Sequence, residues 1–193
     1  MSALKDKLTA LVEPLLASLD LRLWGMEFLP GGRSVLRIYI ENMDGTDTGI
    51  NECSKASRLI GLTLDVEDAI DGSYVLEVST PGLERVFFSA AQLALYAGEV
   101  LELALHSPET SHPGRKKFTG RLALTGEPEK NFRLELLVPA DLSPEDAPAL
   151  IFGWENVKKA RLVYVVPEKP GAPKAKEPKP KKKAADQKAA DPK

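Results

Sequence analysis

The side chains that most often carry out catalysis are few in this sequence and lie far apart. Its 193 residues include one cysteine, Cys53, and two histidines, His106 and His112. A nucleophile of the cysteine or serine type needs a histidine base and a group that orients that base. A zinc site needs three or four cysteine or histidine ligands close together. Cys53 falls on the apolar side of a predicted helix and the histidines share one polar loop, so we expect no catalytic centre, no metal and no cofactor.

Closely spaced basic side chains offer a different chemistry, which is the binding of anions. Two segments, HPGRKKFTGR and VKKAR, are rich in arginine and lysine. Their basic residues are Arg115, Lys116, Lys117, Arg121, Lys158, Lys159 and Arg161. Guanidinium and ammonium groups bind phosphate through charge-assisted hydrogen bonds, so a fold that joins the segments creates a basic face suited to RNA or an RNA-bound protein. The alternative, which stays open, is two solvated strand ends.

The charge of the chain is divided unevenly. The formal net charge is -2, but residues 167–193 alone carry +5 and the rest of the chain carries -7. A protein that coats nucleic acid through counterion release needs a basic body, so contacts with RNA must come from a local patch or from the tail. The tail is rich in Lys, Pro and Ala, and we expect it to be disordered. It either binds RNA through salt-sensitive contacts or serves as a solubilising appendage.

The elements that position these residues begin with a predicted helix. Seven apolar residues recur at steps of three and four, which places them on one helical face. They are Leu4, Leu8, Leu11, Val12, Leu15, Leu16 and Leu19. Pro14 lies inside this pattern, and we expect a kink or a break there because proline lacks an N–H group.

A predicted hairpin follows, with PGGR as its turn. In its first strand Trp24, Met26 and Phe28 occupy alternate positions, which places them on one face. Helical spacing returns from Cys53 to Leu64, and SYVLEVS predicts a third strand. The order helix, strand, strand, helix, strand indicates an N-terminal α/β domain over residues 1–84 of an α+β protein.

The second half of the chain has the period of strands. Five short segments alternate apolar and polar residues and are separated by stretches rich in turn formers: EVLELALH, KKFTGRLALT, NFRLELLV, LIFGW and VKKARLVY. So many strands without room for a long helix are typical of a small closed barrel. We therefore expect an interdomain linker at 85–92, a barrel at 93–166 and the tail at 167–193.

The segment LEVSTPGLERVFF joins the two halves. Pro81 fixes φ at the second position of a turn and Gly82 permits positive φ at the third, which predicts a type II turn. Together with the preceding helix, this segment resembles the bacterial ribosome maturation factor RimP family. The matching residues are Ser57, Arg58, Leu64, Asp65, Tyr74, Leu76, Glu77, Val78, Ser79, Pro81, Gly82, Leu83 and Arg85. Thr80, Glu84 and Val86 depart from the family pattern, where Ser, Asp and Pro stand.

The resemblance covers roughly residues 1 to 166, from the hairpin to WENVKKARLV. It implies an N-terminal α/β domain, a C-terminal barrel similar to SH3 or Sm folds, and a non-enzymatic role in maturation of the small ribosomal subunit. The implied partners are the free or immature small subunit, its ribosomal RNA and small-subunit ribosomal protein twelve. We expect a monomer in the cytoplasm, since no run approaches the roughly 18 apolar residues of a membrane span and a lone cysteine forms no internal disulfide.

Two questions stay open at this point. Arg58 and Arg85 lie on the family motif, and each either contacts the ribosome or forms an internal ion pair, as Arg85 could with Glu77 or Glu84. The function itself has an alternative, a general RNA-binding regulator with an Sm-like barrel. Against it stands the shortage of exposed aromatic residues for stacking bases, since Tyr39 is the main outward candidate.

Overall fold

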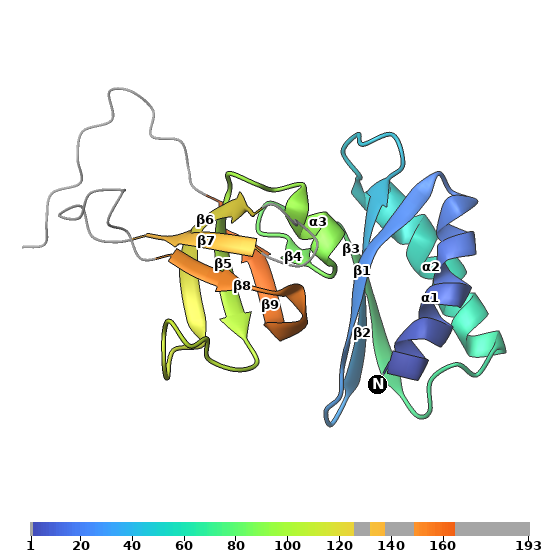
Figure 1. Cartoon of the computed structure of the whole chain (residues 1–193). Coiled ribbons are helices and arrows are strands. Elements are labelled where there is room, and N and C mark those ends of the chain that lie inside the picture. Colours follow the sequence, from blue (N-terminus) through green and yellow to red (C-terminus); the bar gives the residue numbers. More distant parts are fainter. Residues whose placement is uncertain (1, 126–131, 138–148, 165–193) are drawn as a thin grey trace, which may run out of the picture.

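The computed structural model describes residues 2–125, 132–137 and 149–164. In these ranges the chain contains three α-helices, a short 3-10 helix and nine strands arranged in two sheets (Figure 1). The α+β class predicted from the sequence is confirmed. The Lys/Pro/Ala-rich tail at 167–193 lies outside the described residues, so its predicted disorder stays a prediction.

The N-terminal sheet follows the predicted order of elements. They are α1 (Ser2–Ala17), β1 (Leu21–Leu29), β2 (Ser34–Asn42), α2 (Ile50–Val66) and β3 (Tyr74–Ser79). The strand order is β1-β2-β3, with β1 antiparallel and β3 parallel to β2. Both helices pack on one face of this sheet, and the second sheet lies toward the other face (Figure 1).

Pro14 does not break α1, contrary to one of the two expectations for that position. The helix runs from Ser2 to Ala17 with Pro14 inside it. Proline removes one helical hydrogen bond, the one that the carbonyl of Ala10 would accept, at a cost of roughly 3 kcal/mol in a helix interior. Both residues are exposed, so water can reach that carbonyl. Val12 and Leu16 on the opposite side are fully buried, and their burial holds the last turns in place.

The second sheet contains the five predicted strands and one more. Its elements are β4 (Val86–Phe87), α3 (Ala90–Ala94), β5 (Val100–Leu105), β6 (Lys117–Leu124), β7 (Phe132–Leu136), β8 (Ala149–Phe152), the 3-10 helix η1 (Trp154–Asn156) and β9 (Val157–Leu162). The strand order is β4-β9-β5-β6-β7-β8, and all neighbours are antiparallel. The segment 85–92, expected to be a linker, thus contains β4 and the start of α3.

One core unites this second sheet. Alternate residues of its strands, such as Leu103, Phe118 and Phe132, point inward and meet Leu93 of α3. β4 and β8 stand at the two ends of the strand order, and no hydrogen bond joins them within the described residues. Closure into an SH3- or Sm-like barrel therefore stays a prediction.

The alternation predicted that Trp24 shares a face of β1 with Met26 and Phe28. In the structure Trp24 lies on the opposite face. The register of β1 against β2 shifts between Leu23 and Gly25, which leaves Trp24 as the extra residue of a β-bulge. A bulge re-aims a side chain. Met26 consequently joins the core under the helices, while Trp24 joins the core of the second sheet.

Candidate functional site

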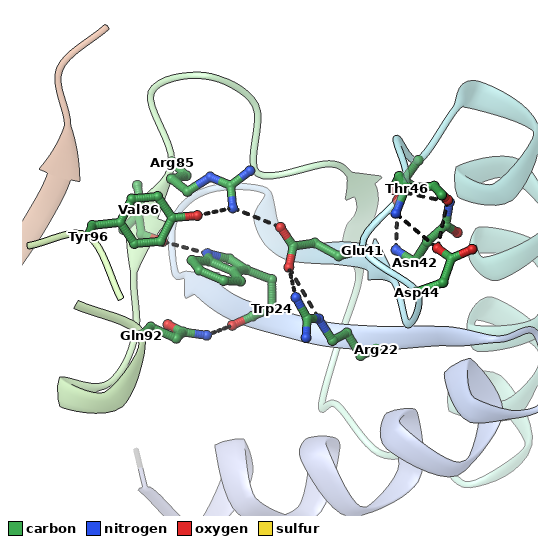
Figure 2. A network of polar contacts seen from close by, with 11 residues as sticks. Arg22, Trp24, Glu41, Asn42, Asp44, Thr46, Arg85, Val86, Gln92 and Tyr96 are labelled. Carbon is green, nitrogen blue, oxygen red and sulfur yellow. Dashed lines mark hydrogen bonds and ion pairs between the residues drawn. The ribbon is translucent and has the colours of Figure 1, made fainter. Parts of the chain in front are cut away.

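The two sheets are joined by a polar network around Glu41 (Figure 2). Arg85 donates through Nη1 to Oε1 of Glu41 at 2.9 Å and to the hydroxyl of Tyr96 at 2.5 Å. Arg22 donates through Nη2 to the other carboxylate oxygen of Glu41, also at 2.9 Å. The side chains of Arg85 and Glu41 are only 23% and 14% exposed, so this ion pair is shielded from salt far more than a surface pair is.

Trp24 is the second part of this junction. Its Nε1 donates to the carbonyl of Val86 at 2.7 Å, and the side-chain amide of Gln92 donates to the carbonyl of Trp24 at 2.6 Å. The guanidinium carbon of Arg85 lies 5.0 Å from the centre of the Trp24 ring, which is a cation–π geometry. Trp24 is thus held by three contacts: through its indole N–H, through its backbone carbonyl and over the face of its ring.

Gly25, the residue after the bulge, permits the ring of Phe88 to lie close to the backbone of β1. A Cβ atom at this position would overlap the ring of Phe88. Tyr39, the partner of Gly25 in the strand register, also packs on Phe88, with ring centres 5.7 Å apart. Its hydroxyl donates to Glu27 at 3.2 Å. Tyr39 is therefore engaged at the junction and is not free to stack a nucleic-acid base.

The segment Ser-Thr-Pro-Gly-Leu lies beside the ion pair. Gly82 has a φ of 69°, the positive value that the predicted type II turn requires at its third position. Four residues of this segment, 80–83, and Arg85 line a pocket of ≈ 450 Å³ together with the loop that follows β2. The motif thus forms one wall of a pocket at the junction.

Arg85 and Arg58 differ in their surroundings. Arg85 forms an internal ion pair with Glu41 and not with the two partners suggested from the sequence. Those two, Glu77 and Glu84, pair with Arg37 at 2.7 Å and with Arg161 at 3.0 Å. Arg58 is exposed on α2 and forms no ion pair within the described part of the chain.

The structure brings the two predicted basic segments together on the outer face of the second sheet. Ala104 of β5 is in register with Lys117 of β6 on one side and with Lys159 of β9 on the other. Two lysines therefore flank a small alanine, and the hollow between them has a volume of ≈ 470 Å³. We call Lys117, Ala104 and Lys159 the lysine row.

The other basic residues of the two segments have partners of their own, with one exception. Arg161 pairs with Glu102 at 2.7 Å as well as with Glu84. Arg121 donates to the carbonyl of Gly98. The charge of Arg161 is thus matched by two carboxylates, whereas Arg121 uses one of its five N–H donors on a backbone carbonyl.

Around the turn before β6, basic side chains fold back on the chain. Lys116 donates to the carbonyl of His106 at 2.9 Å. Arg115 donates to the carbonyl of Lys117 at 2.9 Å and lies over the ring of Phe118, with 4.8 Å between guanidinium carbon and ring centre. Lys158, the exception, is the extra residue of a bulge in β9 and is exposed, and its ammonium group has no hydrogen bond or ion pair within the described residues.

Several residues of the junction were not found from the sequence. Trp24 was assigned to the wrong face because a bulge leaves no trace in a short apolar alternation. Gln92 and Tyr96 lie in or beside α3, a five-residue helix that is too short to show helical periodicity. The only signal was the capping residue Ser89, whose hydroxyl accepts a hydrogen bond from the backbone N–H of Gln92.

Two further properties of the described residues concern other kinds of site. Within 2–125, 132–137 and 149–164, no group of three or more acidic, histidine or cysteine side chains is arranged to hold a metal ion. In the same ranges, no helix has the length and apolar character needed to cross a membrane.

Comparison with known proteins identifies the family. The model of the RimP N-terminal domain matches residues 11–84. A protein of Nitratidesulfovibrio vulgaris named ribosome maturation factor RimP is 43% identical over 176 residues, which cover 86% of this chain and 94% of the relative. The protein of the same name from Lawsonia intracellularis is 34% identical over 177 residues, which cover 84% of this chain and 88% of the relative. The protein of that name from Desulfovibrio desulfuricans is 31% identical over 221 residues, which cover 88% of this chain and 84% of the relative. The chain belongs to the ribosome maturation factor RimP family.

Proposed function

We propose that this protein is a non-enzymatic assembly factor that binds the free or immature small (30S) ribosomal subunit in the cytoplasm and leaves the finished one. Membership of a family of ribosome maturation factors supports a role in ribosome maturation. Such factors assist assembly and are not enzymes.

The observation that carries the proposal is the lysine row. Lys117 and Lys159 are exposed, and neither ammonium group has a hydrogen-bond or ion-pair partner among the described residues. Glu102, the acid that lines the same hollow, is paired with Arg161. Two free ammonium groups on an otherwise acidic chain form a local site for phosphate. We assign this face to contacts with the backbone of ribosomal RNA, with Lys158 at its margin.

A second sheet that closes into an SH3- or Sm-like barrel also offers a surface for a protein partner. We propose that small-subunit ribosomal protein twelve contacts this unit, with RNA phosphates adding to the affinity. The N-terminal α/β domain is assigned to residues 1–84, the interdomain linker to 85–92, the barrel to 93–166 and the disordered basic tail to 167–193.

Departure from the finished subunit requires different affinities for two states of the same target. A factor that binds both states equally changes neither population. Small patches such as the lysine row suit a transient interface better than a large apolar surface does. The junction around Glu41 would hold the two units at one spacing, so that only a subunit with matching contacts binds both.

Sedimentation of cell extract at low magnesium and moderate salt tests the proposal. We expect the protein to migrate with free small subunits and to be absent from complete ribosomes. Migration with assorted messenger RNA that light nuclease treatment abolishes would support a general RNA-binding regulator instead. Migration with neither would contradict both functions.

A further inference from the structure

A groove that is formed by other parts of the chain than the lysine row lies between α2 and β3. It has a volume of ≈ 500 Å³ and is lined by Ile50, Cys53, Ser54, Ser57, Arg58, Leu76, Glu77 and Val78. The first five belong to the N-terminal part of α2 and the last three to β3. A helix and a strand therefore form its two walls.

The strand wall has a free edge. In the order β1-β2-β3, β3 pairs with β2 alone, and none of the described residues forms a backbone ladder with its outer side. An unpaired edge presents N–H and C=O groups that can pair with another extended chain. Strand addition to such an edge is a common way of binding peptides, in which neighbouring pockets receive alternate side chains.

The floor of the groove is apolar. Leu76 and Val78 of β3 are half-buried and contact the core under the helices, and Cys53 is half-buried beside them. Ile50, at the first turn of α2, is 82% exposed. Alternate residues of an added strand would thus bring apolar side chains onto Leu76 and Val78, and would cover Ile50.

The charge of the groove selects the polar part of its ligand. Glu77 forms an ion pair with Arg37 at 2.7 Å, so its negative charge already has a partner. Arg58 is exposed and has no acidic partner among the described residues. The unsatisfied charge in the groove is therefore positive, which fits a carboxylate on the ligand.

We propose that this groove binds an extended segment of a protein partner, which adds as a strand to the free edge of β3. Apolar side chains at alternate positions of the segment pack on Leu76 and Val78, and an acidic side chain pairs with Arg58. RNA fits the groove poorly, because a single cation stands over an apolar floor and no aromatic ring lines it for stacking.

Two blocked peptides of seven residues test the proposal. Each has valine, valine and glutamate at alternate positions and threonine elsewhere, with the glutamate near opposite ends, so that both strand directions are covered. NMR titration of the labelled full chain should show saturable shifts of amides in β3 and the first half of α2. Bound peptide should also slow alkylation of Cys53, the only thiol of the chain.

Charge reversal separates specific from general binding. Arg58→Glu should weaken binding of the glutamate peptide by about fivefold or more and should make the protein prefer a peptide with lysine in place of glutamate. Lys55→Glu, an equal change at an exposed position of α2 outside the groove, should alter neither affinity beyond about twofold.

Three outcomes would overturn the proposal. The first is the absence of saturable shifts with both peptides. The second is shifts confined to the lysine row, which would show only attraction of an acidic peptide to basic residues. The third is a dimer of the chain alone, with β3 amides protected from exchange, which would make a second copy the occupant. None of these results depends on binding to ribosomal subunits, so the proposed function and this inference can fail separately.

Discussion

Arg85 and Glu41, which stand 44 residues apart in the sequence, form an ion pair of 2.9 Å between the two sheets. Glu41 receives a second guanidinium, that of Arg22, from its own sheet. The carboxylate therefore has one partner on each side of the junction, and of its own two ion pairs only the one with Arg85 crosses the junction (Figure 2). This difference makes the contribution of the junction measurable.

Replacing Arg85 with Ala should loosen the two units relative to each other. The change removes a partly buried charge-assisted pair and the contact with Tyr96, which together contribute about 1–3 kcal/mol. Small-angle scattering should show a larger radius of gyration, and NMR relaxation should show separate tumbling of the two units. Arg22→Ala is the matched control, because it deprives the same carboxylate of a partner without crossing the junction. Equal behaviour of the two variants would contradict the assignment.

Truncation of Trp24 should be the most destabilising change at the junction. Trp24→Ala removes a ring that is 6% exposed, and such truncations cost about 3–5 kcal/mol. Trp24→Phe keeps an aromatic ring but loses the hydrogen bond to the carbonyl of Val86, and should cost about 1 kcal/mol in addition to lost packing. Urea unfolding followed by the fluorescence of the remaining Trp154 measures both. A loss below about 1 kcal/mol for Trp24→Ala would show that the ring is not part of a core.

Gly25→Ala should destabilise the protein through Phe88. The added methyl group would overlap the Phe88 ring, and overpacking costs typically about 1–3 kcal/mol. The double variant Gly25→Ala/Phe88→Ala removes that overlap, so the two changes should cost less together than the sum of the single effects. If the losses in free energy of unfolding of the two single variants simply add in the double variant, overlap with the Phe88 ring does not cause the cost of Gly25→Ala.

Cys53 should react slowly with alkylating reagents at neutral pH. Burial, aided by the negative charge of Glu52, raises the pKa of its thiol above the ordinary value. A raised pKa means less thiolate at a given pH, and the thiolate is the reactive form. The rate of maleimide labelling at pH 8 should therefore fall below that of a free cysteine peptide, and the midpoint of its rise with pH should lie above that of the peptide. An equal rate with the same midpoint would show that Cys53 is fully solvated.

The sequence predicted the elements of this fold better than it predicted the relation between them. Long apolar patterns, such as those of α1 and of the five strands β5 to β9, depend on many residues and survive one irregular position like Pro14. The junction depends on single positions. The bulge at Trp24 reverses one side chain without changing the composition of its strand. β4 has two residues, which is too short for any period to be visible.

For the candidate site too, the sequence predicted the segments but not the contacts between them. Two basic segments could be found from the sequence, because charge runs are visible there. Which lysines remain free depends on register, since Lys117 and Lys159 meet across Ala104. Arg161 lies in the same segment but is bound by two carboxylates. The fate of Arg85 was open because its partner, Glu41, lies on a distant strand.

The most direct test of the assembly role is the affinity of the purified protein for free small subunits across a salt series. If the lysine row contacts phosphates, Lys117→Ala/Lys159→Ala should bind more weakly at low salt and should reduce the slope of log affinity against log salt by about 1–2. Lys7→Ala/Lys55→Ala, an equal loss of charge at exposed positions on α1 and α2, should retain the slope of the unchanged protein. Identical slopes for all three proteins, or no binding of the unchanged protein to the subunit, would contradict the account.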